Sequence, residues 1–445
     1  MKKSLILVAS LILLVILVIF FGNQSSVNKS PELEQYENIN RTEQLHLGEI
    51  FQDFSEPIIS EILVKSVKYG GAFPKIGCIQ LYQSDFDKYT SDVTFGDSGE
   101  CVELMENVDF NYSIILKGNG FYLDCNNNKL TGIYSHEEGY AGIIGTENSI
   151  IKNCIVEKKF YNFLLTDFAE VYDSLATGFF THDGTWYSTI GFELRDSSKA
   201  YNSAASNNGG GFALEAFAEV YNGSAINNSA GYWLFTDSGI YDSLAKENRF
   251  GYILRHNASI DNSLAENNIY TGFDFTILGV SIVSNSIARG NSVGFIVGEE
   301  NIIYSSLAED NVVGFSVFGD AKVYDSLSSG NSLYGFALDE NSFVENVAVV
   351  DNEYGIIVSG SSVLKNSVAE NNTWFGLMGH DSLSTIQGGK FCFNGYTGDV
   401  WITDPTLSGV IRVGEIDGEW SGDPTFLPCK KVLLPTEPDI ALIHR

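Results

Sequence analysis

The sequence contains a series of similar short segments. At alternating positions of these segments, seven residues carry side chains that could bind a ligand or act on it chemically. Three are carboxylic acids, two are arginines and two are aromatic: Glu193, Glu215, Asp274, Arg195, Arg255, Trp233 and Phe235. If these segments are β-strands, every second side chain points away from the core, and these seven side chains share one outer face. Paired carboxyl groups can serve as general acid and base, and an arginine can take the α-proton of a uronate.

The largest insertion in the repeated region lies next to these residues in the sequence. It reads FFTHDGTWYST (179–189) and contains His182, Asp183, Trp186 and Tyr187. A loop that interrupts a regular repeat is a frequent location of function. Aromatic rings stack on the C–H faces of sugars while charged groups bind hydroxyls, so a sugar chain suits this combination.

Three interpretations of this face remain open. In the first, it binds a glycan or a protein partner through Arg195, Trp233, Phe235 and the four insertion residues. In the second, Glu193, Glu215, Arg255 and Asp274 are catalytic. In the third, these are ordinary exterior positions with incidental charges and the insertion has no role. Fold alone does not decide between them.

A repeat of 20 to 23 residues would position these side chains. It is marked by one asparagine column: Asn208, Asn228, Asn248, Asn268, Asn291, Asn311, Asn331, Asn352 and Asn372. A leucine-rich repeat has a similar period, but no unit here contains ten residues with helical spacing. Short alternating apolar runs separated by Asn and Gly predict strands and turns. The predicted fold is therefore all-β: a right-handed parallel β-helix with one short coil per repeat.

Several columns of like residues have a structural interpretation. We expect Val220, Ile240 and Ile260, then Leu244 and Leu264, then Phe212 and Tyr232, with their equivalents in other repeats, to face inward. The asparagines would bond neighbouring coils. A file of tyrosines would stack on the exterior: Tyr172, Tyr201, Tyr221, Tyr241, Tyr304 and Tyr324. A strip of small residues, with Ser203, Ser243, Ala205 and Ala245 among them, would be exposed and could dock another chain.

Composition excludes some classes of partner. The net charge of −30 over 445 residues disfavours nucleic acid and anionic lipid surfaces. It is compatible with cation binding, so Ca²⁺ is a possible ligand; no other cofactor or metal is predicted. The chain contains no Walker or H-E-x-x-H motif.

The N-terminal region predicts that most of the chain is located outside the cytoplasm. Lys2 and Lys3 precede an uncharged apolar run, 5–21, which we interpret as a transmembrane signal anchor (1–22) with the bulk of the chain extracellular. A cleaved signal peptide is the alternative. We expect a polar stalk (23–54), an N-terminal cap region (55–112) with a helix at 55–71, the β-helix (113–398) and a C-terminal cap and tail (399–445).

Six cysteines and eight Asn-x-Ser/Thr sites are compatible with a location outside the cytoplasm. The sites permit glycosylation without showing it. An even cysteine number without C-x-x-C spacing favours disulfides over zinc. On proximity in sequence alone, we expect the pairs Cys78–Cys101, Cys125–Cys154 and Cys392–Cys429.

The phrases LDCNNNKLTG, ENSIIKNCIV and NSLAENN resemble those of right-handed parallel β-helix repeat proteins on microbial, especially archaeal, cell surfaces. They are also similar to the periplasmic β-helix proteins of nitrous-oxide reductase maturation. The resemblance covers about residues 113–395, but Asn127 and Asn128 stand where the family usually has Gly-His. It implies the fold and an extracellular location. Family members include lyases, epimerases, hydrolases and adhesins. The expected function is a membrane-anchored surface protein that binds a glycan or partner; the alternative is a polysaccharide lyase or glycoside hydrolase.

Overall fold

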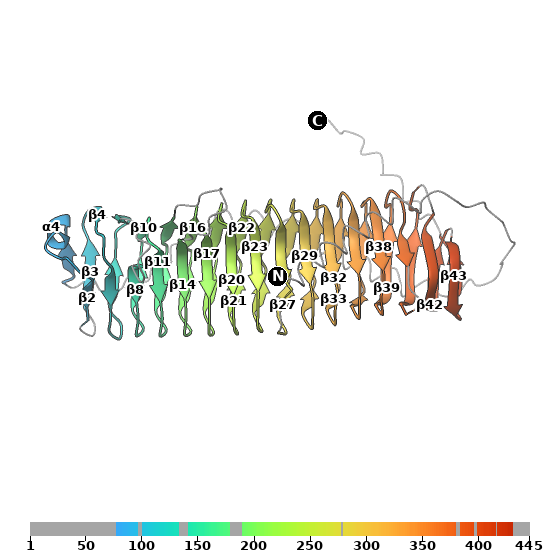
Figure 1. Ribbon diagram of the computed structural model, residues 1–445, viewed down its shortest axis with the longest axis horizontal. Coiled ribbons are helices and arrows are strands. Elements are labelled where there is room, and N and C mark those ends of the chain that lie inside the picture. The colour runs from blue at the N-terminus through green and yellow to red at the C-terminus, as the bar shows by residue number, and fades with distance from the viewer. Residues whose placement is uncertain are drawn as a thin grey trace, which may run out of the picture. The chain divides into compact units, whose positions relative to one another are not determined.

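Short strands separated by tight turns form a parallel β-helix (Figure 1). The computed structural model describes residues 77–96, 100–132, 141–178, 189–276, 279–379, 383–395, 398–414 and 416–429, all within one unit, 57–445. Each coil contributes one strand to each of three rows, and every strand pairs in parallel with its equivalents in the neighbouring coils. The predicted parallel β-helix is confirmed.

The first row carries the predicted ligand face. It consists of β2 (Val93–Phe95), β5 (Ile114–Leu116), β8 (Ala141–Gly145), β11 (Tyr161–Leu165), β14 (Ile190–Leu194), β17 (Gly210–Leu214), β20 (Ala230–Leu234), β23 (Phe250–Leu254), β26 (Thr271–Phe275), β29 (Val293–Val297), β32 (Val313–Val317), β35 (Tyr334–Leu338), β38 (Tyr354–Val358) and β40 (Leu377–Gly379).

The second row carries the tyrosine file. It consists of β1 (Ile79–Leu81), β3 (Cys101–Leu104), β6 (Tyr122–Asp124), β9 (Ile150–Lys152), β12 (Glu170–Tyr172), β15 (Lys199–Tyr201), β18 (Glu219–Tyr221), β21 (Gly239–Tyr241), β24 (Ser259–Asp261), β27 (Ile282–Ser284), β30 (Ile302–Tyr304), β33 (Lys322–Tyr324) and β36 (Phe343–Glu345).

The third row precedes the asparagine column. It consists of β4 (Val108–Asp109), β7 (Lys129–Thr131), β10 (Ile155–Glu157), β13 (Leu175–Thr177), β16 (Ala204–Ser206), β19 (Ser224–Ile226), β22 (Leu244–Lys246), β25 (Leu264–Glu266), β28 (Ile287–Arg289), β31 (Leu307–Glu309), β34 (Leu327–Ser329) and β37 (Ala348–Val350).

Longer strands continue the stack at the C-terminal end. β39 (Val363–Glu370) and β41 (Thr385–Cys392) extend across the second and third rows. β42 (Val400–Val413) pairs with β40 and β41, and β43 (Ile416–Gly422) and β44 (Thr425–Pro428) pair with β42. At the other end, β1 pairs with β3 beside the short helix α4 (Gln83–Phe86). Parallel pairing therefore starts before residue 113 and continues beyond residue 398.

An aromatic stack fills the core along the first row. Phe163, Phe192, Phe212, Tyr232, Tyr252, Phe273, Phe295, Phe315 and Phe336 stack with ring centroids 4.3 to 4.9 Å apart. Val220, Ile240 and Ile260 are buried on the second row. The predictions for these two columns are confirmed.

The prediction for the leucine column and the small-residue strip is wrong. Ala225 and Ala245 are fully buried in the core, while Leu244 and Leu264, which are also buried at 7% exposure, occupy the opposite parity of their strands and lie outside the contiguous core. The reason is steric, because rows one and three meet at a narrow corner. A Cβ atom added to Gly231 would lie 3.2 Å from Cβ of Ala245, so larger side chains do not fit there. Ser203, Ser243 and Ala205 are likewise buried, so they offer no exposed strip.

The asparagine column is a continuous hydrogen-bonded ladder inside that corner. In a typical step, the backbone N and Nδ2 of Asn268 donate to Oδ1 of Asn291 over 2.9 and 3.0 Å. The pattern runs to Asn394, whose two donors bind Asp399. The predicted structural role of these asparagines is confirmed.

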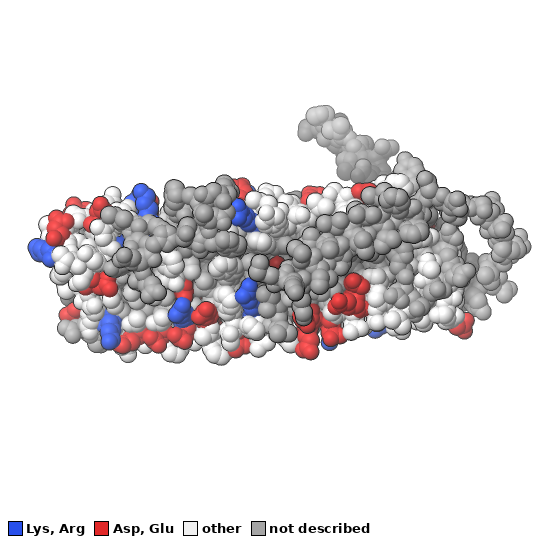
Figure 2. All heavy atoms as spheres, in the orientation of Figure 1, with Lys and Arg blue, Asp and Glu red and all other residues white. Residues whose placement is uncertain are grey.

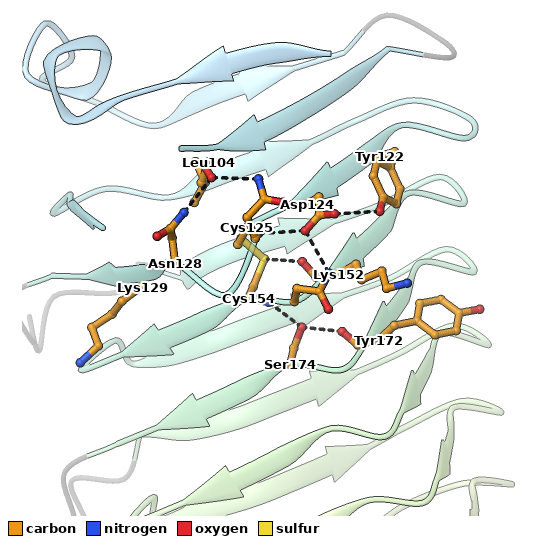
Figure 3. Close-up of a disulfide and its surroundings, with 12 residues drawn as sticks. Leu104, Tyr122, Asp124, Cys125, Asn128, Lys129, Lys152, Cys154, Tyr172 and Ser174 are labelled. Atoms are coloured by element: carbon orange, nitrogen blue, oxygen red, sulfur yellow. Dashed lines mark hydrogen bonds between the residues drawn. A yellow bond between two sulfur atoms is a disulfide. The ribbon is translucent and has the colours of Figure 1, made fainter. Parts of the chain in front are cut away.

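Three disulfides lie towards the ends of the described stack. They join Cys78 to Cys101, Cys125 to Cys154 and Cys392 to Cys429, the pairs expected from proximity. Figure 3 shows Cys125–Cys154 beside Ser174, whose Oγ accepts a 3.1 Å bond from the backbone N of Cys154.

Within the described ranges, no helix combines the length and apolarity needed to cross a membrane. The predicted signal anchor, stalk and helix at 55–71 lie outside the described residues.

Candidate functional site

The outer face of the first row brings the predicted residues into two neighbouring columns. Strand register aligns Glu193, Ala213, Trp233, Ile253 and Asp274. The positions two residues later in the first four of these coils are Arg195, Glu215, Phe235 and Arg255, each directly after the end of its strand. Neighbouring positions in a column are one strand spacing apart, about 4.8 Å.

Glu193, Arg195 and Glu215 form one charged cluster. Nη2 of Arg195 donates a short hydrogen bond to Oε1 of Glu193, and Nε of Arg195 lies 3.6 Å from Oε2 of Glu215. One guanidinium therefore lies between two carboxyl groups from adjacent coils. The two acids differ in environment, because the side chain of Glu193 is 7% exposed and that of Glu215 is 47% exposed.

Burial sets the protonation preference of Glu193. Removal from water raises the pKa of its carboxyl group, and the ion pair with Arg195 opposes this without reversing it. Tyr161, on the preceding coil, also has a raised pKa, first because of burial and then because Glu193 is near. The site thus places a buried acid with a raised pKa beside an acid whose side chain is half exposed.

Aromatic side chains follow on the next coil. The guanidinium of Arg255 lies 5.4 Å from the ring centroid of Phe235, in cation–π geometry. The Trp233 ring reaches back over β17, where a Cβ atom added to Gly210 would lie 3.8 Å from it. On the intervening strand β17, Trp233 is followed towards Glu193 by the small residues Gly210 and Ala213.

Asp274 is separate from the cluster. Burial raises its pKa, and a 3.2 Å hydrogen bond from the backbone N of Thr276 opposes the shift. It lies four strand spacings from Glu193, roughly 19 Å, which is too far for both to act on one bond. The structure therefore joins Glu193, Arg195 and Glu215 and leaves Asp274 apart.

The remaining predictions of ligands concern other parts of the chain. His182, Asp183, Trp186 and Tyr187 lie outside the described residues. Among the residues that are described, no three His, Cys, Asp or Glu side chains are grouped to hold a metal ion, so no Ca²⁺ site can be assigned there.

Two exposed phenylalanines beside the cluster were missed by sequence reasoning. Phe168 and Phe217 are 59% and 60% exposed, at the turns after β11 and β17. Both have a φ of 65°, and Ala216 before Phe217 has a φ of 51°. Left-handed backbone is unusual for a bulky residue, and such outliers are frequent at ligand sites. The available signal was a phenylalanine at a turn position where other coils have a polar residue, such as Asn148, Ser197 and Asn257.

No model of a known protein family matches the chain, and no curated protein sequence matches it. Among solved structures, it is similar to a mutant of the periplasmic alginate epimerase AlgG, with 15% identity over 76% of this chain and 85% of that chain, at a TM-score of 0.35. It is similar to the A-module of the Azotobacter vinelandii mannuronan C-5 epimerase AlgE6, with 12% identity over 75% and 91% of the two chains (TM-score 0.29).

A third similar structure is the catalytic unit of an α-1,3-glucanase from Streptomyces thermodiastaticus. Its identity is 12% over 75% of this chain and 62% of that chain, at a TM-score of 0.25. Identities this low concern the fold and carry no inference about activity. The more specific resemblance to archaeal surface proteins and to nitrous-oxide reductase maturation proteins stays a prediction.

Proposed function

We propose that this protein is a polysaccharide-active glycoside hydrolase whose catalytic residues are Glu193 and Glu215. The observation that carries the proposal is the contrast between two carboxyl groups held by one arginine. Glu193 is buried with a raised pKa, while Glu215 is half exposed. Two acids whose environments differ in this way are typical of acid–base assignments in glycosidases.

Each residue has a defined role in the proposed reaction. The protonated Glu193 donates its proton to the glycosidic oxygen as the C–O bond breaks. The Glu215 carboxylate deprotonates the water that adds to the sugar, or attacks the sugar first and is released by water. Arg195 is a positioning residue that fixes both acids.

An uncharged polysaccharide is the substrate class that this surface favours. The net charge of −30 repels polyanions. Phe168, Phe217 and Trp233 provide ring surfaces on either side of the acid pair for the C–H faces of sugars.

The proposal predicts hydrolysis that depends on the protonated form of Glu193. We expect reducing ends to be released from a panel of neutral glucans, mannans and xylans. We expect Glu193→Gln to lower kcat/KM about 100-fold or more, because the proton donor is lost. Since Glu193 must be protonated, activity should fall as pH rises through its raised pKa, and Glu193→Gln should lack this limb. Glu309→Gln is the matched control, because Glu309 is paired with Arg289 at 2.7 Å on the third row.

Two results would contradict the assignment. One is the absence of reducing ends with every polysaccharide of the panel. The other is an equal loss of activity in Glu193→Gln and Glu309→Gln. Unsaturated uronate products from an anionic polysaccharide would instead indicate a lyase.

A non-catalytic glycan-binding surface is the second candidate. It is favoured by the ion pairs that Arg195 makes with Glu193 and Glu215. These pairs engage the two carboxyl groups that would have to react with a substrate during catalysis. Glycan binding that Trp233→Ala abolishes, without any product from wild type, would support it. In either case we propose a location outside the cytoplasm, supported by the three disulfides; membrane anchoring through residues 1–22 is part of this proposal.

A further inference from the structure

Arg255 and Asp274 are two charged residues on the outer face of the first row that the proposed reaction does not use. Arg255 directly follows β23, and Asp274 lies in β26 of the next coil, in register with Ile253. Burial raises the pKa of Asp274, and Arg255 is among the groups that lower it, so the two side chains are close enough to interact. Within the described part of the chain, however, no ion pair joins them.

The guanidinium of Arg255 is held by an aromatic ring and not by an acid. It lies 5.4 Å from the ring centroid of Phe235, and its Nε is buried without a hydrogen-bond partner among the described residues. Arg195, at the equivalent position three coils away, instead forms ion pairs with Glu193 and Glu215. Because no carboxylate occupies the N–H donors of Arg255, they remain available to a ligand.

A third polar group on this face, the hydroxyl of Thr271, is also unsatisfied. Thr271 begins β26 and aligns with Phe250, Ala230 and Gly210 of the preceding coils. A Cβ atom added to Gly210 would lie 3.8 Å from the ring of Trp233, so this column belongs to the outer face. Oγ1 of Thr271 is buried and has no hydrogen-bond partner in the described ranges. An unsatisfied buried hydroxyl costs free energy, which a ligand that bonds to it would recover.

We infer that Arg255, Asp274 and Thr271 bind one sugar unit of an uncharged polysaccharide through its hydroxyl groups. Neighbouring hydroxyls of a pyranose can accept a hydrogen bond from Arg255 and donate one to Asp274, which satisfies both charges without an ion pair. Ile253, in register with Asp274, provides the apolar contact that such sites combine with a few placed polar groups. The inference rests on the proposed function for its ligand class, but it uses different residues and its readout is binding.

The distance from the acid pair determines which chains can reach this sugar site. Arg255 follows Leu254 as Arg195 follows Leu194, and strand register places the two arginines three coils apart, roughly 14 Å. A disaccharide bound at Glu193 is too short to span this distance, whereas a chain of several sugars along the axis of the stack can. The geometry therefore predicts that the protein prefers longer chains.

An acidic sugar is the other ligand that an arginine could bind. Figure 2 shows basic side chains scattered singly over the face that it draws, with no continuous basic surface among the side chains that it colours. A polyanion would find little compensation there for the net charge of −30. The carboxyl group of Asp274 beside Arg255 would also repel the carboxylate of an acidic sugar when ionised. The surroundings of Arg255 therefore favour an uncharged sugar.

The test measures binding of the full chain to neutral oligosaccharides, from disaccharide to hexasaccharide, of glucan, mannan and xylan by isothermal titration calorimetry. Where wild type hydrolyses the ligand, the variants are compared in a Glu193→Gln background. We expect Arg255→Leu and Asp274→Asn each to weaken binding of the hexasaccharide roughly tenfold, because a charged hydrogen bond is lost. Binding of the disaccharide should not change.

Thr271→Val and a matched arginine variant separate binding from folding. Valine occupies the positions equivalent to Thr271 in the next two coils, Val293 and Val313, so it fits this column. We expect Thr271→Val to weaken hexasaccharide binding while thermal stability stays the same or rises, because an unsatisfied hydroxyl is removed. Arg289→Leu is the matched control and should leave binding unchanged, because Arg289 is paired with Glu309 at 2.7 Å on the third row.

Every outcome bears on the inference. Weakening confined to the longer chains supports it, whether or not hydrolysis is ever detected. Absence of binding of every neutral oligosaccharide by wild type, or equal hexasaccharide binding by wild type and Arg255→Leu, overturns it. Binding of an anionic polysaccharide that Arg255→Leu abolishes and Asp274→Asn strengthens also overturns it, in favour of an acidic sugar. A loss of thermal stability in Thr271→Val with unchanged binding overturns the assignment of Thr271 to the site.

Discussion

Phe217 combines two features that each oppose folding. Its φ of 65° is unfavourable for a bulky side chain, and 60% of the residue is exposed to water. Asn tolerates this backbone, and Asn148 occupies the equivalent turn of another coil with a φ of 60°. We therefore expect Phe217→Asn to raise the free energy of unfolding by about 1 kcal/mol while weakening glycan binding.

Denaturant unfolding and affinity electrophoresis measure the two effects. The reciprocal variant Asn148→Phe should lose about the same stability without a gain in binding. If Phe217→Asn leaves both properties unchanged, the strained turn has no role in ligand recognition.

Lys159 is a charged residue within the N-terminal coils. It is 1% exposed, and Nζ donates to the backbone oxygens of Phe110 and, at 3.1 Å, Tyr112. Burial lowers its pKa from 10.5 to about 8, although Asp109 and Asp92 oppose the shift. The native state therefore loses this proton at lower pH than the unfolded state does.

The sign of the pH effect follows from that difference. Between pH 8 and 10.5 the unfolded state binds more protons at Lys159, so its contribution to stability rises with pH. We expect wild type to gain stability relative to Lys159→Met across this range in urea unfolding. Parallel curves for the two proteins would show that Lys159 does not titrate in this way.

At the scale of elements, the asparagine ladder links the coils. Asn291 donates to Asn311 and to the Ala265 oxygen and accepts from Asn268, with all donor–acceptor distances between 2.9 and 3.1 Å. The ladder ends at Asp399, a carboxylate that accepts from the Asn394 backbone N at 2.8 Å and its Nδ2 at 3.2 Å. An acid suits this end, because the backbone N–H of each asparagine in the ladder donates in its direction, to Oδ1 of the next asparagine.

We expect Asn291→Ala to lower the free energy of unfolding by about 3 kcal/mol. The substitution leaves buried donors of Asn268 without their acceptor, and unsatisfied buried groups cost about 1–3 kcal/mol each. Ser292→Ala, at the exposed neighbouring position, is the control and should change stability little. If Asn291→Ala lowers the free energy of unfolding by less than Ser292→Ala does, the ladder does not hold the coils together.

At the scale of the whole stack, contacts between neighbouring coils stabilise every part of the axis, whereas the disulfides stabilise the regions towards its ends. A coil contacts only its neighbours, so stability is distributed along the axis and the ends fray first. The bridges span 23, 29 and 37 residues, and closing a loop of that size stabilises by about 3 kcal/mol. Reduction should therefore act locally.

Hydrogen exchange with and without reductant measures this effect. We expect faster exchange in β1–β10 and in β41–β44 after reduction, and unchanged exchange in β17–β35. Double Cys125→Ser and Cys154→Ser substitution should affect the N-terminal region alone. Uniform loss of protection along the stack would instead indicate one cooperative unit.

The repeat, the parallel β-helix and the columns of equivalent residues that contact one another in adjacent coils could all be predicted from the sequence. Asn268 meets Asn291, and Phe212 meets Tyr232, because a repeated spacing in a parallel stack brings equivalent positions into register. Alternation also placed Glu193 and Arg195 on an outer face, because neighbouring strand positions have opposite orientations.

The tertiary structure decided which parity faces inward where both are apolar, and which exposed groups act together. Ala245, not Leu244, lies in the core because the corner beside Gly231 has little room, a constraint that no single strand contains. Arg195 joins Glu193 to Glu215 while Asp274 stays apart, because side-chain reach and burial act across coils.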